Sequence, residues 1–380
     1  MSISNSLKNE LMNILIHLVQ LPSENPPGKT EQIVNYLTSK VFKEKEGFQN
    51  EVITHVKNGV ILHNIITRLG TGKNKILLSG HLDVVPVGDV ANWKYPPFSA
   101  TLIKGRVHGR GSADMKGGLS SLIGVLKTLG NNKPFLEDNE LIFLGTADEE
   151  AGMSGSQTLE KGGIMNNANL LIIAEPTNLN VGIAEKGLLW TTLKIYGKSA
   201  HGSTPEEGIN AIEAGLNILP QLHKCLDNKK NQILGSSTLN VGKIKGGTKI
   251  NIVPDFVELE VDFRLIPEQS HLSVINKLKE INSEPCKVDV KITNHLPALE
   301  TDSNHPFIKN LQKISQSEII GLPYATDAAK FITQENPVPF LIYGPGNPNN
   351  VHKINESISI EQVYRATECL NEALLKTYLK

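Results

Sequence analysis

The stretch KILLSGHLDVV, residues 75–85, reads as an apolar strand that ends in two potential metal ligands, His81 and Asp83. Two later apolar runs, 141–144 and 170–174, end in the same way. The acidic residues that follow them are Asp148, Glu149, Glu150 and Glu175. Side chains at the carboxyl ends of strands converge on one crevice of an open α/β sheet, although they lie far apart in the sequence. The pattern therefore predicts an α/β fold with a metal site at one edge of the sheet.

Length and charge limit the class of protein. A chain of 380 residues suits about two domains, because single cores rarely grow beyond about 250–300 residues. Its 38 basic and 39 acidic residues are interspersed and give a net charge of −1. No field of one sign would attract nucleic acid or an anionic membrane, so we expect a small-molecule partner.

The cysteines and the N-terminal segment indicate the compartment. Cys225, Cys286 and Cys369 are far apart and form no CxxC pair, which argues against a disulfide framework and against a thiolate zinc site. A reducing cytoplasm fits this pattern best. The apolar run 14–21 contains polar residues and lacks a basic leader, so we expect no signal peptide. No stretch approaches the roughly 20 apolar residues of a membrane span.

Hydrophobic periodicity divides the chain into three segments. In 1–185 and 294–380, apolar strands alternate with amphipathic helices, which predicts a mixed, mainly parallel sheet flanked by helices. Strands and helices in 186–293 follow the order β-α-β-β-α-β, the split βαβ or ferredoxin-like motif. A smaller α+β domain is therefore expected to interrupt the larger one. Before the closing helix, Ser359 and Gln362 have the spacing of a capping box.

Six side chains have the chemistry of a two-metal amide hydrolase. Such a site needs a bridging carboxylate, further nitrogen and oxygen ligands, and one unbound carboxylate that moves a proton. The candidate ligands are His81, Asp114, Glu150, Glu175 and His352, and the candidate base is Glu149. Each residue alone has a simpler interpretation, since a single histidine usually lies in the core or on the surface, and Asp114 alone would be a helix cap. Three separate strands that end in such groups favour the metal site.

The chain also resembles a known family in six motifs, which occur in the family's order and cover nearly the whole length. The motifs are SGHLDVVPVGDVANW, GRGSADMKGG, GTADEEAG, AEPT, SAHGSTPEEGINAI and GPGNPNNVHKINE. They resemble those of the dizinc family that contains aminoacylases, acetylornithine deacetylases, succinyl-diaminopimelate desuccinylases, glutamate carboxypeptidases and dipeptidases. This resemblance implies two divalent metal ions, with zinc as the first expectation and cobalt and manganese as alternatives.

The resemblance assigns a role to each candidate residue. One ion would be bound by His81, Asp114 and Glu175, and the other by Asp114, Glu150 and His352. Asp114 would bridge the two ions, and Asp83 would orient the imidazole of His81. Glu149 would be the general base that takes a proton from water and the acid that returns it to the departing amine.

The resemblance further implies that the inserted domain serves as a lid and in dimerisation, so we expect a homodimer. His201 would reach an active site, commonly that of the partner subunit, and stabilise the oxyanion. Arg264 would bind a substrate carboxylate, and Asn251 would make a neighbouring polar contact. Without the resemblance, His201 would be read as a loop residue, Arg264 as a solvated strand end and Asn251 as part of a turn.

The substrate is expected to be a small N-acyl amino acid. Spacing and loops resemble most the succinyl-diaminopimelate desuccinylases, which act in lysine biosynthesis, and acetylornithine deacetylases, dipeptidases and carboxypeptidases are the alternatives. Many relatives carry an arginine soon after Thr-Asp, whereas this chain has TDAAKF, in which Lys330 either replaces it or lies on an exposed helix face. A non-catalytic binding protein on the same fold would be expected to lack a ligand or the base, and none is missing here.

Overall fold

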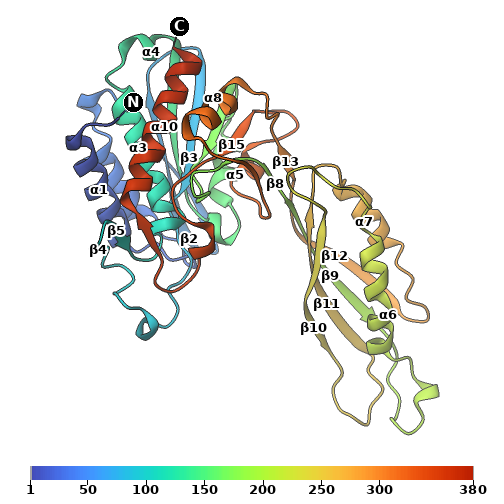
Figure 1. The fold of residues 1–380 in the computed structure, drawn as a ribbon. Coiled ribbons are helices and arrows are strands. Elements are labelled where there is room, and N and C mark those ends of the chain that lie inside the picture. The colour runs from blue at the N-terminus through green and yellow to red at the C-terminus, as the bar shows by residue number, and fades with distance from the viewer. Residues whose placement is uncertain (1, 380) are drawn as a thin grey trace. The chain divides into compact units, whose positions relative to one another are not determined.

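The computed structural model describes residues 2–379, which form two compact units (Figure 1). The first unit contains the chain up to residue 183 together with Thr301–Ile320 and the part that begins at Thr326. The second unit contains Ala184–Glu300 and the short segment Gly321–Ala325. The larger fold is thus interrupted by the smaller one, with boundaries at 183/184 and 300/301, where the sequence suggested 185/186 and 293/294.

A mixed sheet forms the centre of the first unit, with the strand order β1-β2-β6-β3-β7-β15-β8. The strands in this order, seven of the nine in the sheet, are β1 (Gln49–Lys57), β2 (Val60–Leu69), β3 (Asn74–His81), β6 (Asn139–Thr146), β7 (Ala168–Ile173), β8 (Val181–Glu185) and β15 (Phe340–Ile342). The four central strands β6, β3, β7 and β15 are parallel, and the outer pairings are antiparallel. Covered faces explain why the central strands are continuous apolar runs. The predicted α/β class is confirmed.

Helices flank this sheet. They are α1 (Asn5–Gln20), α2 (Glu31–Tyr36), α3 (Gly117–Leu129), α4 (Lys133–Asp138), α5 (Ser154–Lys161), α8 (Pro306–Ser315), α9 (Ala328–Phe331) and α10 (Ile360–Tyr378). The side chain of Ser4 caps α1 by accepting from Leu7 N at 3.2 Å. α3 contacts α1, α10 and β3, and most of its residues are buried because these elements enclose it (Figure 1).

A small antiparallel sheet links two distant parts of the first unit. It consists of β4 (Thr101–Ile103), β5 (Arg106–His108) and β16 (Ser357–Ser359), in the order β16-β5-β4. Ser359 precedes α10, but its side chain makes no capping hydrogen bond. Gln362 Oε1 instead accepts from Gly346 N at 3.1 Å, and its Nε2 donates to Asn178 Oδ1 at 2.7 Å. The predicted capping box is therefore wrong, because loop contacts engage the glutamine.

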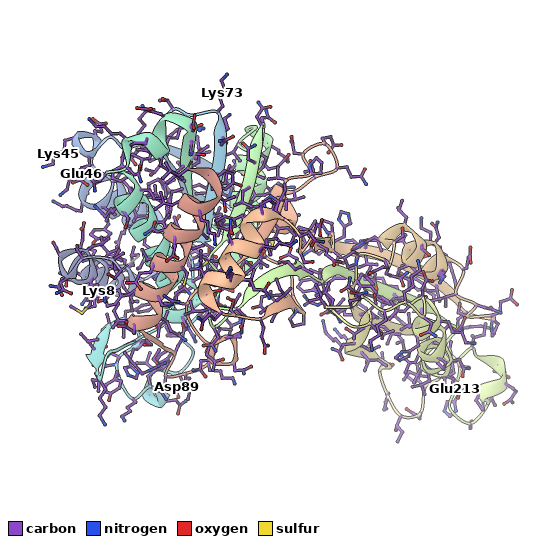
Figure 2. The ribbon with its side chains drawn as sticks, turned by 45° about the horizontal axis from the view of Figure 1, so that its top comes forward. Lys8, Lys45, Glu46, Lys73, Asp89 and Glu213 are labelled. Carbon is purple, nitrogen blue, oxygen red and sulfur yellow. The ribbon has the colours of Figure 1, made fainter. Side chains whose placement is uncertain are left out.

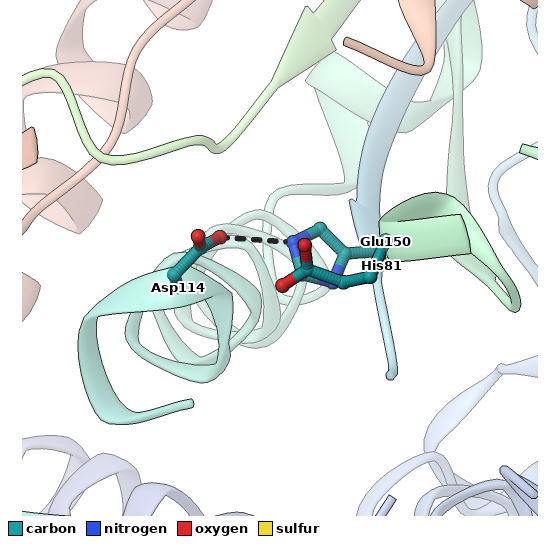
Figure 3. Close-up of side chains that lie close together, drawn as sticks. All are labelled: His81, Asp114 and Glu150. Atoms are coloured by element: carbon teal, nitrogen blue, oxygen red, sulfur yellow. Dashed lines mark hydrogen bonds and ion pairs between the residues drawn. The ribbon is translucent and has the colours of Figure 1, made fainter. Parts of the chain in front are cut away.

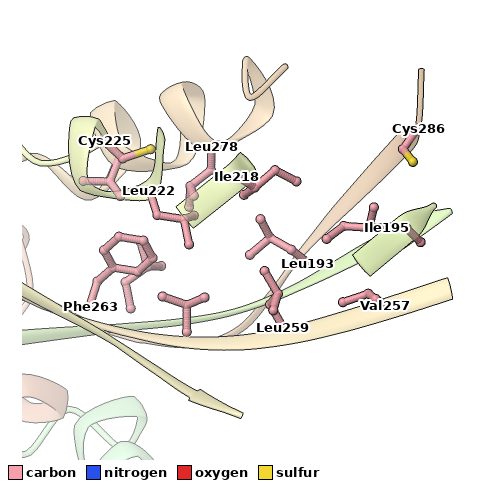
Figure 4. Close-up of a cluster of buried hydrophobic side chains, with 14 of the residues drawn as sticks. Leu193, Ile195, Ile218, Leu222, Cys225, Val257, Leu259, Phe263, Leu278 and Cys286 are labelled. Atoms are coloured by element: carbon pink, nitrogen blue, oxygen red, sulfur yellow. The ribbon is translucent and has the colours of Figure 1, made fainter. Parts of the chain in front are cut away.

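The second unit has the predicted β-α-β-β-α-β order. Its elements are β9 (Gly187–Tyr196), α6 (Ala211–Lys224), β10 (Thr238–Gly246), β11 (Phe256–Leu265), α7 (His271–Lys279) and β12 (Lys287–Leu296), and the sheet order is β10-β11-β9-β12. Every second residue of β11, including Leu259 and Phe263, is buried. These side chains pack with Ile218 and Leu222 of α6 and Leu278 of α7 into a separate core (Figure 4). One sheet face is thus apolar and covered by the helices, and the other is polar.

The structure agrees with two expectations from the sequence, which are the mixing of charges on the surface and the absence of disulfide bonds among the three cysteines. Charged side chains of both signs lie beside each other, as Lys45 and Glu46 do in Figure 2. The three cysteines are buried free thiols. Among residues 2–379, no helix is both long and apolar enough to cross a membrane.

Gly118 of α3 packs directly against the main chain at the end of β7. A Cβ at this position would overlap the carbonyl oxygen of Ala174. Gly118→Ala is therefore expected to lower the free energy of unfolding by about 1–3 kcal/mol, because the packed main chain around Ala174 cannot move far enough to relieve the overlap. In α6, a Cβ on Gly215 comes no closer than 3.4 Å to its neighbours, so the control Gly215→Ala should be neutral or stabilising. Chemical denaturation followed by circular dichroism measures both, and equal losses would contradict the expectation.

Candidate metal centre

The five candidate ligands come together at the carboxyl edge of the first unit's sheet. His81 ends β3, Glu150 lies in the turn Glu149–Ala151 after β6, and Glu175 follows β7. Asp114 lies in the turn Ser112–Lys116 before α3, and His352 lies in the loop after β15. Because β6, β3, β7 and β15 are adjacent and parallel, their carboxyl ends share one edge. Figure 3 shows Asp114, His81 and Glu150 side by side at this edge.

The two histidines contact opposite oxygens of Asp114. His81 Nε2 lies 3.0 Å from Asp114 Oδ1, and His352 Nε2 lies 3.1 Å from Asp114 Oδ2. Glu175 Oε1 lies 3.6 Å from His81 Nε2, and Glu150 Oε2 lies 3.1 Å from His352 Nε2. The donor atoms therefore form two groups that share one carboxylate. This is the arrangement that a carboxylate bridging two cations requires.

The main chain of Asp83 orients His81. His81 Nδ1 lies 2.9 Å from the carbonyl oxygen of Asp83. A carbonyl can only accept, so in the neutral imidazole Nδ1 carries the proton and Nε2 directs its lone pair toward Asp114 and Glu175. This is the tautomer that a metal-binding histidine needs. The nearest carboxylate oxygen of Asp83 is farther away, 3.8 Å from Nδ1.

The carboxylate of Asp83 holds the turn that carries the candidate base. Glu149 N donates to Oδ1 at 3.1 Å, and Glu150 N donates to Oδ2 at 3.2 Å. Asn25 Nδ2 donates to the same Oδ2 at 2.8 Å and to Asp148 Oδ1 at 3.0 Å. Sequence reasoning misses Asn25, because its function depends on two carboxylates that only the fold brings to it.

Buried carboxylates dominate the charge of the centre. Burial raises the pKa of Glu149 well above its ordinary value, and Glu175 adds to the rise while His81 opposes it. Burial likewise raises the pKa of Glu175 well above its ordinary value, with a contribution from Asp114. Burial also disfavours the charge on Asp114, but hydrogen bonds with His352 and His81 hold its pKa below the ordinary value. Such a cluster is stable only when cations or protons offset its negative charge.

The residues present fit divalent cations. Glu150 Oε1 is buried and has no hydrogen-bond partner within residues 2–379. An orphaned carboxylate oxygen among acids is an atom that a bound cation would satisfy. Ligand atoms of His81, Asp114 and Glu150 all lie within 4.8 Å of one another, so these three side chains can hold a metal ion. Imidazole nitrogen and carboxylate oxygen suit zinc, cobalt and manganese alike.

A further buried acid, Asp327, lies in the TDAAKF stretch. Thr146 Oγ1 at the end of β6 donates to Asp327 Oδ2 at 2.6 Å, and burial raises the pKa of Asp327 to about 6. Three residues later, Lys330 is half-buried in α9, and burial lowers its pKa. Lys330 therefore does not lie on a fully exposed helix face. The Thr-Asp pair was the only signal in the sequence that pointed to Asp327.

His201 and Asn251 lie together in the second unit. The main chains of His201 and Ile252 pair, and Gly202 N donates to Asn251 O at 2.9 Å. His201 Nδ1 accepts from Ser203 N at 3.1 Å, and Ser203 Oγ lies 2.7 Å from the same nitrogen. Because a main-chain amide can only donate, the proton of the neutral imidazole is on Nε2. The exposed His201 ring therefore presents an N–H donor.

Arg264 lies near the end of β11, on the polar face of the second unit's sheet. Its Nε is 3.0 Å from Asp262 Oδ1, and both side chains are about one-third exposed. A partly exposed ion pair of this kind contributes little to stability. The guanidinium is therefore available to a second carboxylate at low cost.

The fold and the site define a metal-dependent hydrolase that acts on amide bonds. The sequence model of peptidase family M20/M25/M40 matches residues 77–376, and the chain belongs to this family. The resemblance that the sequence motifs carried is thereby confirmed.

Individual relatives match over nearly the full length. A protein of Staphylococcus aureus (strain MSSA476) named "Probable succinyl-diaminopimelate desuccinylase" is 30% identical, and the match covers 98% of each chain. The "Acetylornithine deacetylase" of Vibrio parahaemolyticus is 32% identical over 87% of this chain and 88% of that one. The crystal structure of an M20 family metallo-carboxypeptidase from Sulfolobus solfataricus superposes with a TM-score of 0.78 at 21% identity, over 96% and 98% of the two chains.

Proposed function

We propose that the protein is a two-metal deacylase that converts N-succinyl-LL-2,6-diaminopimelate and water to succinate and LL-2,6-diaminopimelate. The observation that carries the metal-dependent chemistry is the placement of Asp114 between two histidines, each beside a second carboxylate. The substrate is supported by the Staphylococcus aureus relative, because its similarity extends over 98% of both chains.

The donor set supports two cations rather than one. Asp114 Oδ1 faces His81 while Oδ2 faces His352, which supports one ion on each side of this carboxylate. The proposed ligands are His81, Asp114 and Glu175 for one ion and Asp114, Glu150 and His352 for the other. Such a pair of ions would supply Lewis acidity, which would lower the pKa of a water molecule and polarise the amide carbonyl.

Glu149 is the proposed proton carrier. It follows β6 directly beside the ligand Glu150, and the hydrogen bonds of both main-chain amides to Asp83 hold the turn in place. Burial raises its pKa, which suits a group that must take a proton from water and then return it to the leaving amine. In this scheme Glu149 is not a ligand, so its protonation state can change during turnover.

His201, Asn251 and Arg264 are the proposed contributions of the second unit. The Nε2–H of His201 would donate to the oxyanion that develops on the amide carbonyl. Arg264 would bind the α-carboxylate of the substrate, and Asn251, beside His201, would make a further polar contact. The half-buried Lys330 is proposed to contact the carboxylate of the succinyl group, in place of the arginine that many relatives carry.

We also propose that the protein works as a homodimer in the cytoplasm. The family resemblance, which implies dimerisation through the inserted domain, supports this proposal, and the second unit exposes apolar side chains such as Tyr196, Leu216, Ile244 and Ile250. A dimer would allow His201 to serve the site of its own chain or that of the partner. The free cysteines are compatible with a reducing compartment.

Acetylornithine deacetylase is the second candidate, supported by the Vibrio parahaemolyticus relative. We expect kcat/KM for N-succinyl-LL-2,6-diaminopimelate to exceed that for N-acetylornithine by about 10- to 100-fold. A charge-assisted hydrogen bond to the distal carboxylate, worth about 1.5–3 kcal/mol, exists only with the former. Turnover of the zinc-loaded protein with both compounds and a dipeptide panel measures this. A preference for N-acetylornithine supports the second candidate, fastest release from dipeptides indicates a peptidase, and no turnover of any compound refutes the proposal.

A further inference from the structure

Glu356 is neither a candidate ligand nor a candidate base, but its side chain contacts the main chain of the loop that leads to Asp114. Its carboxylate is 1% exposed. Oε1 accepts from Ala113 N at 2.8 Å and from Asp114 N at 3.1 Å. Oε2 accepts from Gly111 N at 3.2 Å and from Arg110 Nη1 at 2.7 Å. One buried carboxylate thus takes up four donors, three of which belong to the main chain of this loop.

The loop needs such an acceptor because its backbone is irregular. Gly111 has a left-handed φ of +79°, so the chain turns sharply before α3, and the amides of Gly111, Ala113 and Asp114 donate to Glu356 instead of to a main-chain carbonyl. Successive N–H groups in a turn of this kind form a concave anion site, which here is filled by a side chain of the protein itself. The position of Asp114 is therefore set by Glu356 as well as by α3.

Arg110 forms an ion pair with Glu356 and also contacts the main chain beside His352. Arg110 is 3% exposed, and its guanidinium lies 5.1 Å from the ring centre of Trp93. Its Nη1 also donates to Lys353 O at 3.1 Å, and its Nη2 to Pro86 O at 3.4 Å. Lys353 is the residue next to His352. Arg110, from the loop of Asp114, and Glu356, from the loop of His352, therefore connect these two loops by hydrogen bonds in both directions.

The two histidines depend on this link to different degrees. His81 is 1% exposed and is held by β3 and by its hydrogen bond to the main chain of Asp83. The side chain of His352 is 52% exposed and lies on a loop, with a φ of +60°. Its ring nitrogen Nε2 contacts Asp114 and Glu150. Its position therefore follows that of its loop, which the Arg110–Glu356 pair anchors.

We propose that Glu356 and Arg110 are positioning residues that set the placement of His352 relative to Asp114, and with it the affinity for the cation shared by Asp114, Glu150 and His352. This inference rests on the proposed two-metal function. The cation on the side of His81 and Glu175 depends on the pair only through Asp114, so its affinity changes less.

The test is zinc titration of the metal-free protein by calorimetry, with elemental analysis after dialysis. Glu356→Gln keeps the shape of the side chain but leaves Arg110 without its counter-charge and directs an amide N–H₂ at the donors. One of the two zinc sites, the one that contains His352 in this proposal, is expected to lose about 10- to 100-fold in affinity, the usual effect of removing a group that supports metal ligands, while the other stays within a few-fold. The matched control is Glu140→Gln on β6, which removes a partly exposed ion pair with Arg68 of β2 and should leave both affinities unchanged.

Two outcomes separate this inference from the proposed function. If the unaltered protein binds fewer than two zinc ions, the two-metal function fails. If it binds two and Glu356→Gln binds both as tightly as before, the positioning inference is overturned. If circular dichroism shows that Glu356→Gln does not fold, Arg110→Lys is tested in its place. Lysine keeps the positive charge, but its single ammonium group cannot replace the guanidinium, which donates to both Glu356 and Lys353 O. The same weakening of one site is then expected, and unchanged affinities would overturn the inference.

Discussion

Glu149→Gln is expected to lower kcat by about two to four orders of magnitude, the usual contribution of a general acid–base group. Glutamine has nearly the same shape but cannot take a proton from water or return one to the amine. The main-chain amide of residue 149 keeps its hydrogen bond to Asp83, so the turn that carries Glu150 should persist. Zinc content should therefore remain at the level of the unaltered protein. Steady-state kinetics and elemental analysis on one preparation measure both quantities.

The control for this substitution is Glu137→Gln, the same chemical change at an exposed position of α4. It should leave kcat and zinc content unchanged. Near-normal turnover of Glu149→Gln would rule out Glu149 as the proton carrier. Loss of one zinc ion would instead show that Glu149 is a ligand.

Asp114→Ala is expected to remove both cations and nearly all activity. The Asp114 carboxylate contacts both histidines, so its loss takes an oxygen ligand from each proposed ion. Groups that only support ligands account for about 10- to 100-fold in metal affinity, and loss of a shared ligand should exceed this range for each ion. Elemental analysis after dialysis should find less than one zinc ion per chain, and added zinc should restore little turnover.

Asp138→Ala, at an exposed position of α4, is the control for Asp114→Ala and should keep both ions. Two tightly held ions in Asp114→Ala would exclude a bridging role. Circular dichroism shows whether Asp114→Ala is still folded, because unfolding of the first unit would abolish the helical signal of long helices such as α1 and α10. Loss of zinc with an unchanged helical signal therefore reports loss of the metal ligand.

The candidate ligands could be found in the sequence because four of them lie where a regular element ends or begins and the fifth, His352, lies in a family motif. His81, Glu150 and Glu175 follow strands whose apolar runs are visible by composition, and parallel strands bring their carboxyl ends to one edge whatever the separation in sequence. Asp114 precedes an apolar helix, and His352 lies within the motif GPGNPNNVHKINE, which carried the family resemblance. Periodicity did not predict β1, because it is an edge strand with no continuous buried face.

The residues that hold the ligands in place could not be found in this way. Asn25 joins Asp83 to Asp148, and Glu356 joins two loops, through contacts between segments that are 58 to 246 residues apart. Gln362 looked like half of a capping box, but a hydrogen bond to Gly346 N engages it. In each case the alternative partner is absent from the local sequence, so no spacing rule could indicate it.

By itself, the sequence determined the α/β class, the interruption by a smaller α+β unit and the family, because periodicity and ordered motifs are local properties of the chain. Only the tertiary structure decided that the two oxygens of Asp114 face different histidines. It also decided that the Asp83 carboxylate accepts hydrogen bonds from the turn of Glu149, and that Glu356 accepts hydrogen bonds from the loop of Asp114. The physical reason is that buried polar groups must find partners wherever the fold provides them. Those partners come from segments that meet only when the chain is folded.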